Sequence, residues 1–287
     1  MERKGLIVDG NNLLHSSYHV SQKLSGKINN GTVFFFLRVL ISVLKKGNYQ
    51  HLLIFFDGGG DNFRKEILSD YKAQRTKMPE ELWEQMQKIK VLLKESNIAL
   101  IQMVDCEADD LIASFVNQKN QEGSPIIFDI FTRDKDLLQL LDKNINILKY
   151  IEGKSTIFTH EDFYREYNFA PNNYVDYLSL LGDNIDNIKG IKGIGPVNAK
   201  KLIQEFSTVE NIYQKIETLP ENIKKLLENQ EGTAYLNKRI IKLDKNITFS
   251  PEEIKNWDFQ WESWKSNKKL REFCEKNQFT SILKSLD

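Results

Sequence analysis

The sequence has 287 residues, more than one domain of usual size needs, and 40% of them are hydrophobic, which is enough for a buried core. Its 40 Lys and Arg residues balance 40 Asp and Glu residues, and on its face this zero net charge argues against a nucleic-acid-binding protein. The apolar stretches are too short or too interrupted for a membrane span, the N-terminus lacks a signal-peptide pattern, and Cys106 and Cys274 form no disulfide or zinc motif, so we expect a soluble intracellular protein.

Strand-like runs alternate with helix-period runs in the first half of the chain. Strands are predicted at residues 5–9, 52–57, 98–104, 126–132 and 145–150, and helices at residues 33–46, 80–96 and 107–119. Continuous Val, Ile, Leu and Phe runs separated by helices indicate a mainly parallel sheet that helices cover on both faces. The predicted fold class is therefore α/β.

From about residue 160 the pattern becomes helical. Apolar residues recur with helical spacing over 174–181, and a glycine-rich stretch, GIKGIG, then leads to Pro196, which is well placed to open the next helix. The glycines resemble a dinucleotide-binding loop, but they follow a predicted helix rather than a strand, which argues against that interpretation. We expect a C-terminal helical module.

Acidic residues follow four of the predicted strands. They are Asp9 after the first strand, Asp57 after the second, Glu107, Asp109 and Asp110 after the third, and Asp134 and Asp136 after the fourth. Because ligands of such sheets bind beyond the carboxyl ends of the strands, we expect these acids to converge at one edge. For the stretch at 107–110 taken alone, an ordinary helix start that favours acids is the alternative.

Asp183 and Asp186 in GDNIDN bring the predicted cluster to nine carboxylates. Two bare carboxylates about 4 Å apart repel by roughly 4 kcal/mol at an effective dielectric near 20, so the cluster must take up protons or bind cations. Oxygen ligands without His or Cys favour Mg²⁺ or Mn²⁺ over zinc. Two such ions about 3.5 to 4 Å apart can activate water and stabilise the leaving oxygen of a phosphodiester.

Setting the nine acids aside leaves 40 basic residues against 31 acids, a surplus of nine positive charges. Two segments concentrate the surplus: residues 62–78, with Arg64, Lys65, Tyr71, Lys72, Arg75 and Lys77, and residues 189–201, with Lys189, Lys192, Lys200 and Lys201. Basic residues beside a metal cluster suit a polyanion, and the N–H groups of a glycine hairpin can bind phosphates without reading bases. For 62–78 alone, a solvated helix face is the favoured alternative.

These residues resemble the structure-specific 5′ nucleases, which comprise bacterial and phage 5′-3′ exonucleases, flap endonucleases and the 5′-nuclease domain of DNA polymerase I. The resemblance runs over essentially the whole chain, in the family's order and spacing. The matching stretches are IVDGNNLLH, FFDGGGDNFRKEILSDYKAQR, EADD, TRDKDLLQL and VDYLSLLGDNIDNIKGIKGIGPVNAKKL. The tail LREFCEKNQFTSIL resembles the end of that domain in DNA polymerase I, and we expect a stand-alone nuclease.

The resemblance implies an α/β nuclease domain at 1–168 with a helical arch at about 61–95, and a helical DNA-binding domain at 169–287 with a helix-hairpin-helix-type motif at about 174–206. It implies that Asp9, Asp57 and Asp109 hold a first Mg²⁺ or Mn²⁺ beside Glu107 and Asp110, that Asp134, Asp136, Asp183 and Asp186 hold or support a second, and that the hairpin at 188–196 binds K⁺. The catalytic residues it implies are Asp9, Asp109, Lys72 and Arg75. The DNA contacts expected are His15, Arg64, Tyr71, Lys72, Arg75, Lys189, Gly190, Lys192, Gly193, Gly195, Lys200 and Lys201.

Four positions depart from the family's pattern. The family commonly has an aromatic residue at the position of His15 and often Arg at that of Ser16, which makes base positioning near the cut a point to examine. Arg133 stands where Gly is usual, and Phe35 stands where a small residue is common. None of these departures removes a carboxylate.

The expected function is that of a metal-dependent 5′-3′ exonuclease or 5′-flap endonuclease acting on branched, nicked or RNA-primed DNA in replication and repair. We expect a monomer in the bacterial cytoplasm, associated with the nucleoid, with a DNA polymerase as a partner and no membrane contact. Two alternatives stay open: a DNA-junction-binding protein with weakened catalysis, and a PIN-type RNase. PIN domains are usually much shorter and lack the hairpin module.

Overall fold

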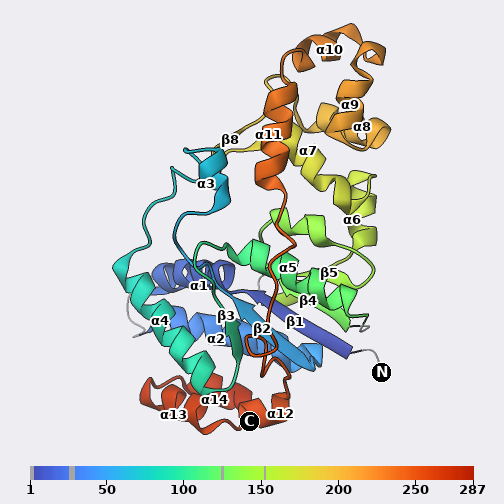
Figure 1. Cartoon of the computed structure of the whole chain (residues 1–287). Coiled ribbons are helices and arrows are strands. Elements are labelled where there is room, and N and C mark those ends of the chain that lie inside the picture. Colours follow the sequence, from blue (N-terminus) through green and yellow to red (C-terminus); the bar gives the residue numbers. More distant parts are fainter. Residues whose placement is uncertain (1–2, 26–29, 124–125, 152) are drawn as a thin grey trace.

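The computed structural model describes residues 3–25, 30–123, 126–151 and 153–287. Its centre is a six-stranded sheet in the order β3-β2-β1-β4-β5-β6, in which every neighbouring pair is parallel except β5 and β6 (Figure 1). The strands are β1 (Arg3–Asp9), β2 (His51–Phe55), β3 (Ala99–Ile101), β4 (Ile126–Phe131), β5 (Ile145–Ile151) and β6 (Lys154–Phe158). The five strands predicted from the sequence and the α/β class are confirmed. The largely exposed edge strand β6, with the sequence KSTIF, was not predicted because it carries no buried run.

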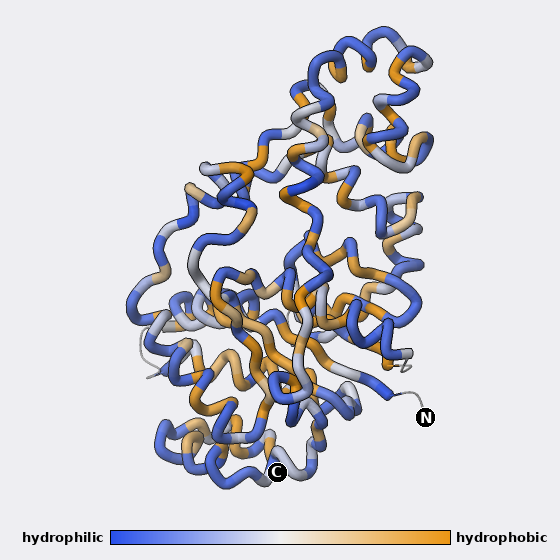
Figure 2. Tube along the Cα trace, viewed as in Figure 1, coloured by the Kyte–Doolittle hydropathy of each residue, from blue (hydrophilic) through white to orange (hydrophobic). Residues whose placement is uncertain are grey.

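Helices cover both faces of this sheet because side chains alternate along its strands. Leu6 and Val8 of β1 point into a core shared with α1, α2 and α4, whereas Ile7 points into a core shared with α5. The helices of this part are α1 (Gly10–Ser25), α2 (Gly31–Gly47), α3 (Phe63–Ile67), α4 (Glu80–Glu95), α5 (Ala108–Gln121), the 3₁₀ helix η1 (Asp136–Leu140) and α6 (His160–Tyr167). Figure 2 shows the apolar strands at the centre of the molecule. The predicted helices at 33–46, 80–96 and 107–119 are confirmed as α2, α4 and α5.

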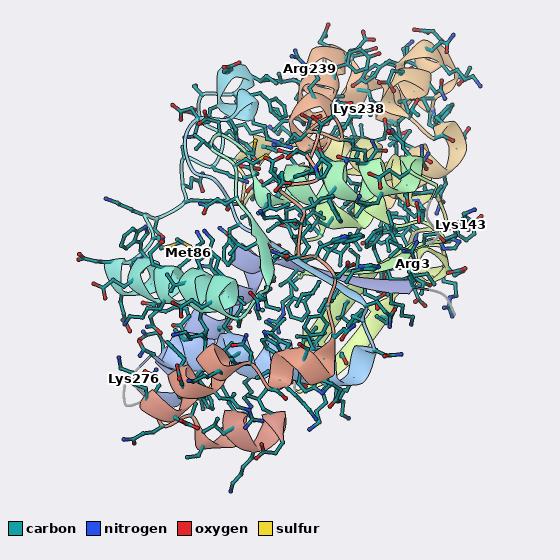
Figure 3. All side chains as sticks on the ribbon, turned by 60° about the horizontal axis from the view of Figure 1, so that its bottom comes forward. Arg3, Met86, Lys143, Lys238, Arg239 and Lys276 are labelled. Carbon is teal, nitrogen blue, oxygen red and sulfur yellow. The ribbon has the colours of Figure 1, made fainter. Side chains whose placement is uncertain are left out.

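A helical module follows the sheet, at the top of Figure 1. It contains η2 (Pro171–Asn173), α7 (Tyr174–Leu181), the antiparallel hairpin of β7 (Gly182–Asp183) and β8 (Ile188–Lys189), α8 (Pro196–Phe206), α9 (Val209–Gln214), η3 (Ile216–Thr218), α10 (Glu221–Leu227) and α11 (Glu231–Ile241). Pro196 opens α8, as its position predicts. Lys238, labelled beside Arg239 on α11 in Figure 3, forms ion pairs with Asp176 of α7 at 2.6 Å and Glu210 of α9 at 2.7 Å. These pairs tie three helices of the module together.

The last helices return to the α/β part, at the bottom of Figure 1. They are α12 (Trp261–Lys265), α13 (Lys268–Lys276) and α14 (Thr280–Leu286). Leu270, Cys274 and Ile282 belong to the same core as α2 and α4. The domain assigned from the sequence to residues 169–287 is therefore divided in space, because its tail packs under the sheet rather than with the helical module. No helix within the described residues is long and apolar enough to cross a membrane.

Candidate active site

Acids from separate strand ends line one cavity of about 190 Å³. Its lining residues are Asp9, Asn11, Asn12, His15, Asp57, Lys72, Arg75, Glu107, Asp109 and Asp134. The parallel sheet places these carboxylates together because β1, β2 and β4 are adjacent and end at the same edge. The convergence expected from the sequence is thus present for five of the nine acids in a single cavity.

Asp9 is fixed where β1 turns into α1. Its Oδ1 accepts a hydrogen bond from the Asn12 N–H at 2.9 Å, as an N-terminal helix cap does, and its Oδ2 accepts one from the Thr132 hydroxyl at 2.9 Å. Glycine is required at position 10, because a Cβ there would lie 2.6 Å from the Phe55 carbonyl oxygen. The sharp turn therefore holds the Asp9 carboxylate in one orientation at the sheet edge.

Asp57 is held by a second segment and caps a helix to which it does not belong. Its Oδ2 accepts a hydrogen bond from the Asn11 side-chain amide at 2.6 Å, its N–H donates to Asn11 Oδ1 at 3.1 Å, and its Oδ1 accepts from the Ala108 N–H at 2.8 Å. Glu107, the residue at the N-cap of α5, makes no capping hydrogen bond with its side chain. Helix capping therefore does not explain why an acid stands at position 107. The Glu107 side chain lines the cavity instead.

The other acids lie on two loops next to this cavity. Asp134 Oδ1 accepts a hydrogen bond from the Asp136 N–H at 2.9 Å, and Asp183 Oδ1 accepts one from the Ile185 N–H at 2.8 Å. Lys135 forms an ion pair with Asp183 at 3.0 Å. Burial and the neighbouring charges of Asp134, Asp183 and Asp186 raise the pKa of Asp136 to about 7. The ion pair between Lys135 and Asp183 joins the second loop to the first.

Two cations of the segment predicted as an arch reach into the acids. Lys72 Nζ lies 2.7 Å from Glu107, and Arg75 lies 2.8 Å from Asp186. Burial alone would lower the pKa of Lys72, but the charges of Glu107 and Asp186 outweigh it and raise that pKa. Lys72 has a φ of 56°, a left-handed conformation that a residue with a Cβ seldom adopts, and its N–H donates to the Asp186 carbonyl at 3.1 Å. Strain of this kind is common at functional sites.

Asp110 follows Asp109 on α5 but does not line the cavity, because its carboxylate pairs with Arg64. Arg64 donates to its two oxygens at 2.5 and 2.8 Å, and the Asp244 N–H donates to Oδ1 at 2.8 Å. Arg64 is only 2% exposed and also donates to the Ile240 carbonyl at 2.7 Å. Arg64, which was predicted to contact DNA, is therefore enclosed in this structure, and Asp110 is the partner of its buried guanidinium.

Tyr71, another predicted DNA contact, is also buried. It is 4% exposed, and its hydroxyl lies 3.2 Å from carboxylate oxygens of Glu107 and Asp186. The side chain therefore supports Glu107 and Asp186 from within the arch segment. That segment consists of α3, an irregular stretch at residues 68–79, and α4.

The charge balance of the cavity favours divalent cations. Burial together with the charges of Asp57 and Asp134 raises the pKa of Asp9 to about 7, and burial together with Asp134 and Asp9 raises the pKa of Asp109 well above its usual value. The Asp136 Oδ1 is buried and has no hydrogen-bond partner. An all-carboxylate donor set with raised pKa values and an unpartnered oxygen fits hard divalent ions.

The carboxylates are not yet arranged as ligands. Within the described ranges, no group of three or more His, Cys, Asp or Glu side chains is placed to hold a metal ion as it stands. Lys72, Arg75 and Lys135 form ion pairs with Glu107, Asp186 and Asp183. The cations of the chain thus neutralise part of the cluster.

The predicted hairpin residues lie apart from the acid cavity. Lys189, Lys192 and Lys201 are exposed, whereas Lys200 Nζ donates to the Glu166 carbonyl at 2.6 Å. Gly193 has a φ of +88°, which favours glycine, and a Cβ on Gly190 would lie 2.0 Å from the Leu181 carbonyl oxygen. Gly195 is the residue before α8.

Known proteins resemble the chain over its full length. The family model for the N-terminal resolvase-like domain of 5′-3′ exonucleases matches residues 4–168, and the model for their C-terminal SAM fold matches residues 169–276. A 5′-3′ exonuclease from Buchnera aphidicola subsp. Schizaphis graminum is 35% identical over 261 residues, which cover 87% of this chain and 90% of that protein. The chain belongs to the 5′-3′ exonuclease family. It is accordingly a nuclease, a hydrolase of phosphodiester bonds.

Two further comparisons give one relative in sequence and one neighbour in fold. DNA polymerase I from Caldicellulosiruptor bescii is 33% identical over 290 residues, which cover 99% of this chain and 33% of that protein. The flap endonuclease of bacteriophage T5, solved as a pseudo-enzyme-product complex with DNA and metal ions, superposes with a TM-score of 0.67 at 22% identity, over 99% of each chain. The second likeness shows a shared fold.

Several residues that position the acids were not predicted. Asn11 and Thr132 bind Asp57 and Asp9, as described above, and the Asn62 amide donates to Glu107 at 2.8 Å. Gln102 accepts a hydrogen bond from the buried Lys90 at 3.0 Å and donates one to the main-chain carbonyl of Asp57 at 2.8 Å. Asn11, Asn62 and Thr132 stand close in sequence to the acids of the 5′-3′ exonuclease motifs, and this is the signal that could have indicated them.

The four residues that depart from the pattern of the 5′-3′ exonuclease family lie in different surroundings. The exposed His15 lines the acid cavity, and the Ser16 hydroxyl donates to the Leu13 carbonyl at 3.0 Å. Phe35 is buried, 7% exposed, and packs edge-on against Phe34. Arg133, next to Asp134, donates to the Tyr150 carbonyl at 2.6 Å.

Proposed function

We propose that the chain is a metal-dependent 5′-3′ exonuclease and 5′-flap endonuclease that acts on branched, nicked or RNA-primed DNA during replication and repair. The observation that carries this proposal is the single cavity in which five carboxylates from separate segments meet Lys72 and Arg75. The bacteriophage T5 flap endonuclease, a fold neighbour, was solved with DNA and metal ions, which supports a nucleic-acid substrate and metal dependence.

The acids other than Asp110 are the proposed ligands of two Mg²⁺ or Mn²⁺ ions. When bound, the ions would supply water activation and neutralise charge on the leaving oxygen. Glu107 and Asp186 would be neutralised by the bound ions in place of Lys72 and Arg75. The two basic side chains would then be free to bind the scissile phosphate. His15, at the cavity wall, would contact the nucleotide next to the cut.

The helical module is the proposed grip on duplex DNA. Lys189, Lys192 and Lys201 are exposed around the glycine hairpin and would bind backbone phosphates, with K⁺ bound at 188–196. Fusion of a similar domain to DNA polymerase I in Caldicellulosiruptor bescii supports a polymerase as partner. We further propose a monomer in the bacterial cytoplasm.

End-labelled 5′-flap DNA tests the proposal. Cleavage near the branch is expected in Mg²⁺ and none with EDTA. Asp134→Asn is expected to bind the flap normally and to lose turnover, whereas Glu272→Gln, at an exposed position of α13, is expected to keep it. Full activity of Asp134→Asn would overturn the assignment. Normal binding without cleavage by the unaltered protein in Mn²⁺ would favour a junction-binding protein, and preference for structured RNA would favour a PIN-type RNase.

A further inference from the structure

A second cavity on the α/β part shares no lining residue with the acid cavity, and it lies between α2, α14, Tyr150 of β5 and Gly153. Its volume is about 470 Å³. In Figure 1, α2 and α14 lie in the lower part of the molecule, at the other end from α8 and α10. The cavity is therefore separate from the glycine hairpin that we propose as the duplex grip.

Three cations of α2 line this cavity: Arg38, Lys45 and Lys46. Lys45 Nζ donates to the Ser285 carbonyl at 3.1 Å, and within the described residues Arg38 and Lys46 have no hydrogen bond or ion pair. Basic residues in the last turn of a helix are expected from the helix dipole, which accounts for Lys45 and Lys46. It does not account for Arg38, which lies two turns earlier on the same face.

The rest of the lining completes an anion site. Ser42, Tyr150, Ser281 and Ser285 bring hydroxyl groups, and no carboxylate from the described residues lines the cavity. The Tyr150 hydroxyl donates to Ser42 Oγ at 3.2 Å, and this hydrogen bond joins β5 to α2 at the edge of the cavity. Three cations together with hydroxyl donors match the oxygens of a phosphate.

The wall of this cavity is connected to the acid loop. Arg133 donates to the carbonyl of Tyr150 at 2.6 Å, and the next residue along the chain is Asp134 of the acid cavity. Arg133 is exposed and basic, so a further positive charge lies beside Tyr150 in the cavity wall. A strand that leaves the acid cavity on this side would meet phosphate-binding groups along its path.

We propose that the cavity lined by Arg38, Lys45 and Lys46 binds a phosphate group of a nucleotide. A volume of about 470 Å³ is large enough for the phosphate with its sugar. The phosphate belongs either to a DNA strand beyond the nick or to a free mononucleotide. The DNA source rests on the proposed function, whereas phosphate binding itself does not require cleavage.

The test compares ligand binding by two variants, one that lacks two positive charges of the cavity and one that lacks two positive charges elsewhere. The variant is Arg38→Gln/Lys46→Gln, and the matched control is Lys268→Gln/Lys269→Gln on α13, where both side chains are exposed. Fluorescence anisotropy of a nicked flap with two duplex arms, and of the same flap with one arm, is measured in EDTA over a range of salt. Calorimetry with dAMP and with inorganic phosphate measures the free ligands. Thermal unfolding checks both variants, and Arg38→Gln alone is used if the double variant unfolds.

For a DNA source, the variant is expected to bind the two-armed flap about tenfold more weakly, and the slope of log K against log salt is expected to fall by about one per lost phosphate contact. The control keeps the slope of the unaltered protein. For a free nucleotide, dAMP binds the unaltered protein and binds the variant at least tenfold more weakly. The proposal is overturned if the variant matches the control in every arm. The binding measurements are made in EDTA, where metal-dependent cleavage does not occur. They therefore test phosphate binding even if the protein fails to cleave DNA in the nuclease assay.

Discussion

Replacing Arg64 by Met tests whether the buried pair with Asp110 holds the base of the arch segment. Arg64 is 2% exposed and Asp110 is 3% exposed, so the substitution leaves a buried carboxylate with one remaining donor, the Asp244 N–H. Breaking a buried pair from one side costs about 3–5 kcal/mol. The Ile240 carbonyl also loses its donor from Arg64. We therefore expect the free energy of unfolding to fall by at least about 3 kcal/mol, a large part of the roughly 5–15 kcal/mol typical of folded domains.

Urea unfolding followed by circular dichroism measures this loss. The neighbouring Lys65→Met, at a 45% exposed side chain, is the control and is expected to change stability by about 0.5 kcal/mol or less. The double variant Arg64→Met/Asp110→Leu removes both charges and is expected to recover most of the loss. A change below about 1 kcal/mol for Arg64→Met alone, or no recovery in the double variant, would refute the reasoning.

Two further predictions concern Asn11 and His51. Asn11→Ala removes the amide that orients Asp57, and we expect kcat on a 5′ flap to fall on the order of tenfold with stability nearly unchanged; an unchanged kcat would exclude a positioning role. Burial lowers the pKa of His51 below its ordinary value of 6.5, so its contribution to stability is complete above pH 6.5 and is lost as the pH falls below it. His51→Phe keeps a ring against Trp257 and does not titrate, so urea unfolding at pH 7.5 and 5.5 should show a smaller loss for the variant; equal losses would contradict this.

The convergence of the acids could be predicted because it follows from local patterns. Each strand of the parallel sheet is a short apolar run, and Asp9, Asp57 and Asp134 stand where those runs end. Parallel topology then brings the ends to one edge without any knowledge of side-chain contacts. The hairpin and the start of α8 were predicted for a similar reason, since glycine and Pro196 act within a few residues.

Pairings between distant residues could not be predicted in this way. Asp109 and Asp110 are neighbours on α5, and a helix turns successive side chains about 100° apart, so only one of them faces the cavity. The partner of Asp110 is Arg64, 46 positions earlier, and nothing in the basic segment marks it as buried. The return of α12–α14 to the α/β core was missed because their apolar faces fit either domain.

The central claim is that the carboxylate cluster exists to bind divalent metal ions, and counting bound ions tests it most directly. Free Mn²⁺ measured by electron paramagnetic resonance during titration gives the number of ions bound without DNA or turnover. We predict two ions per chain for the unaltered protein and at least one fewer for Asp109→Asn, with Glu272→Gln unchanged. No bound Mn²⁺, or the same number in Asp109→Asn, would contradict the account.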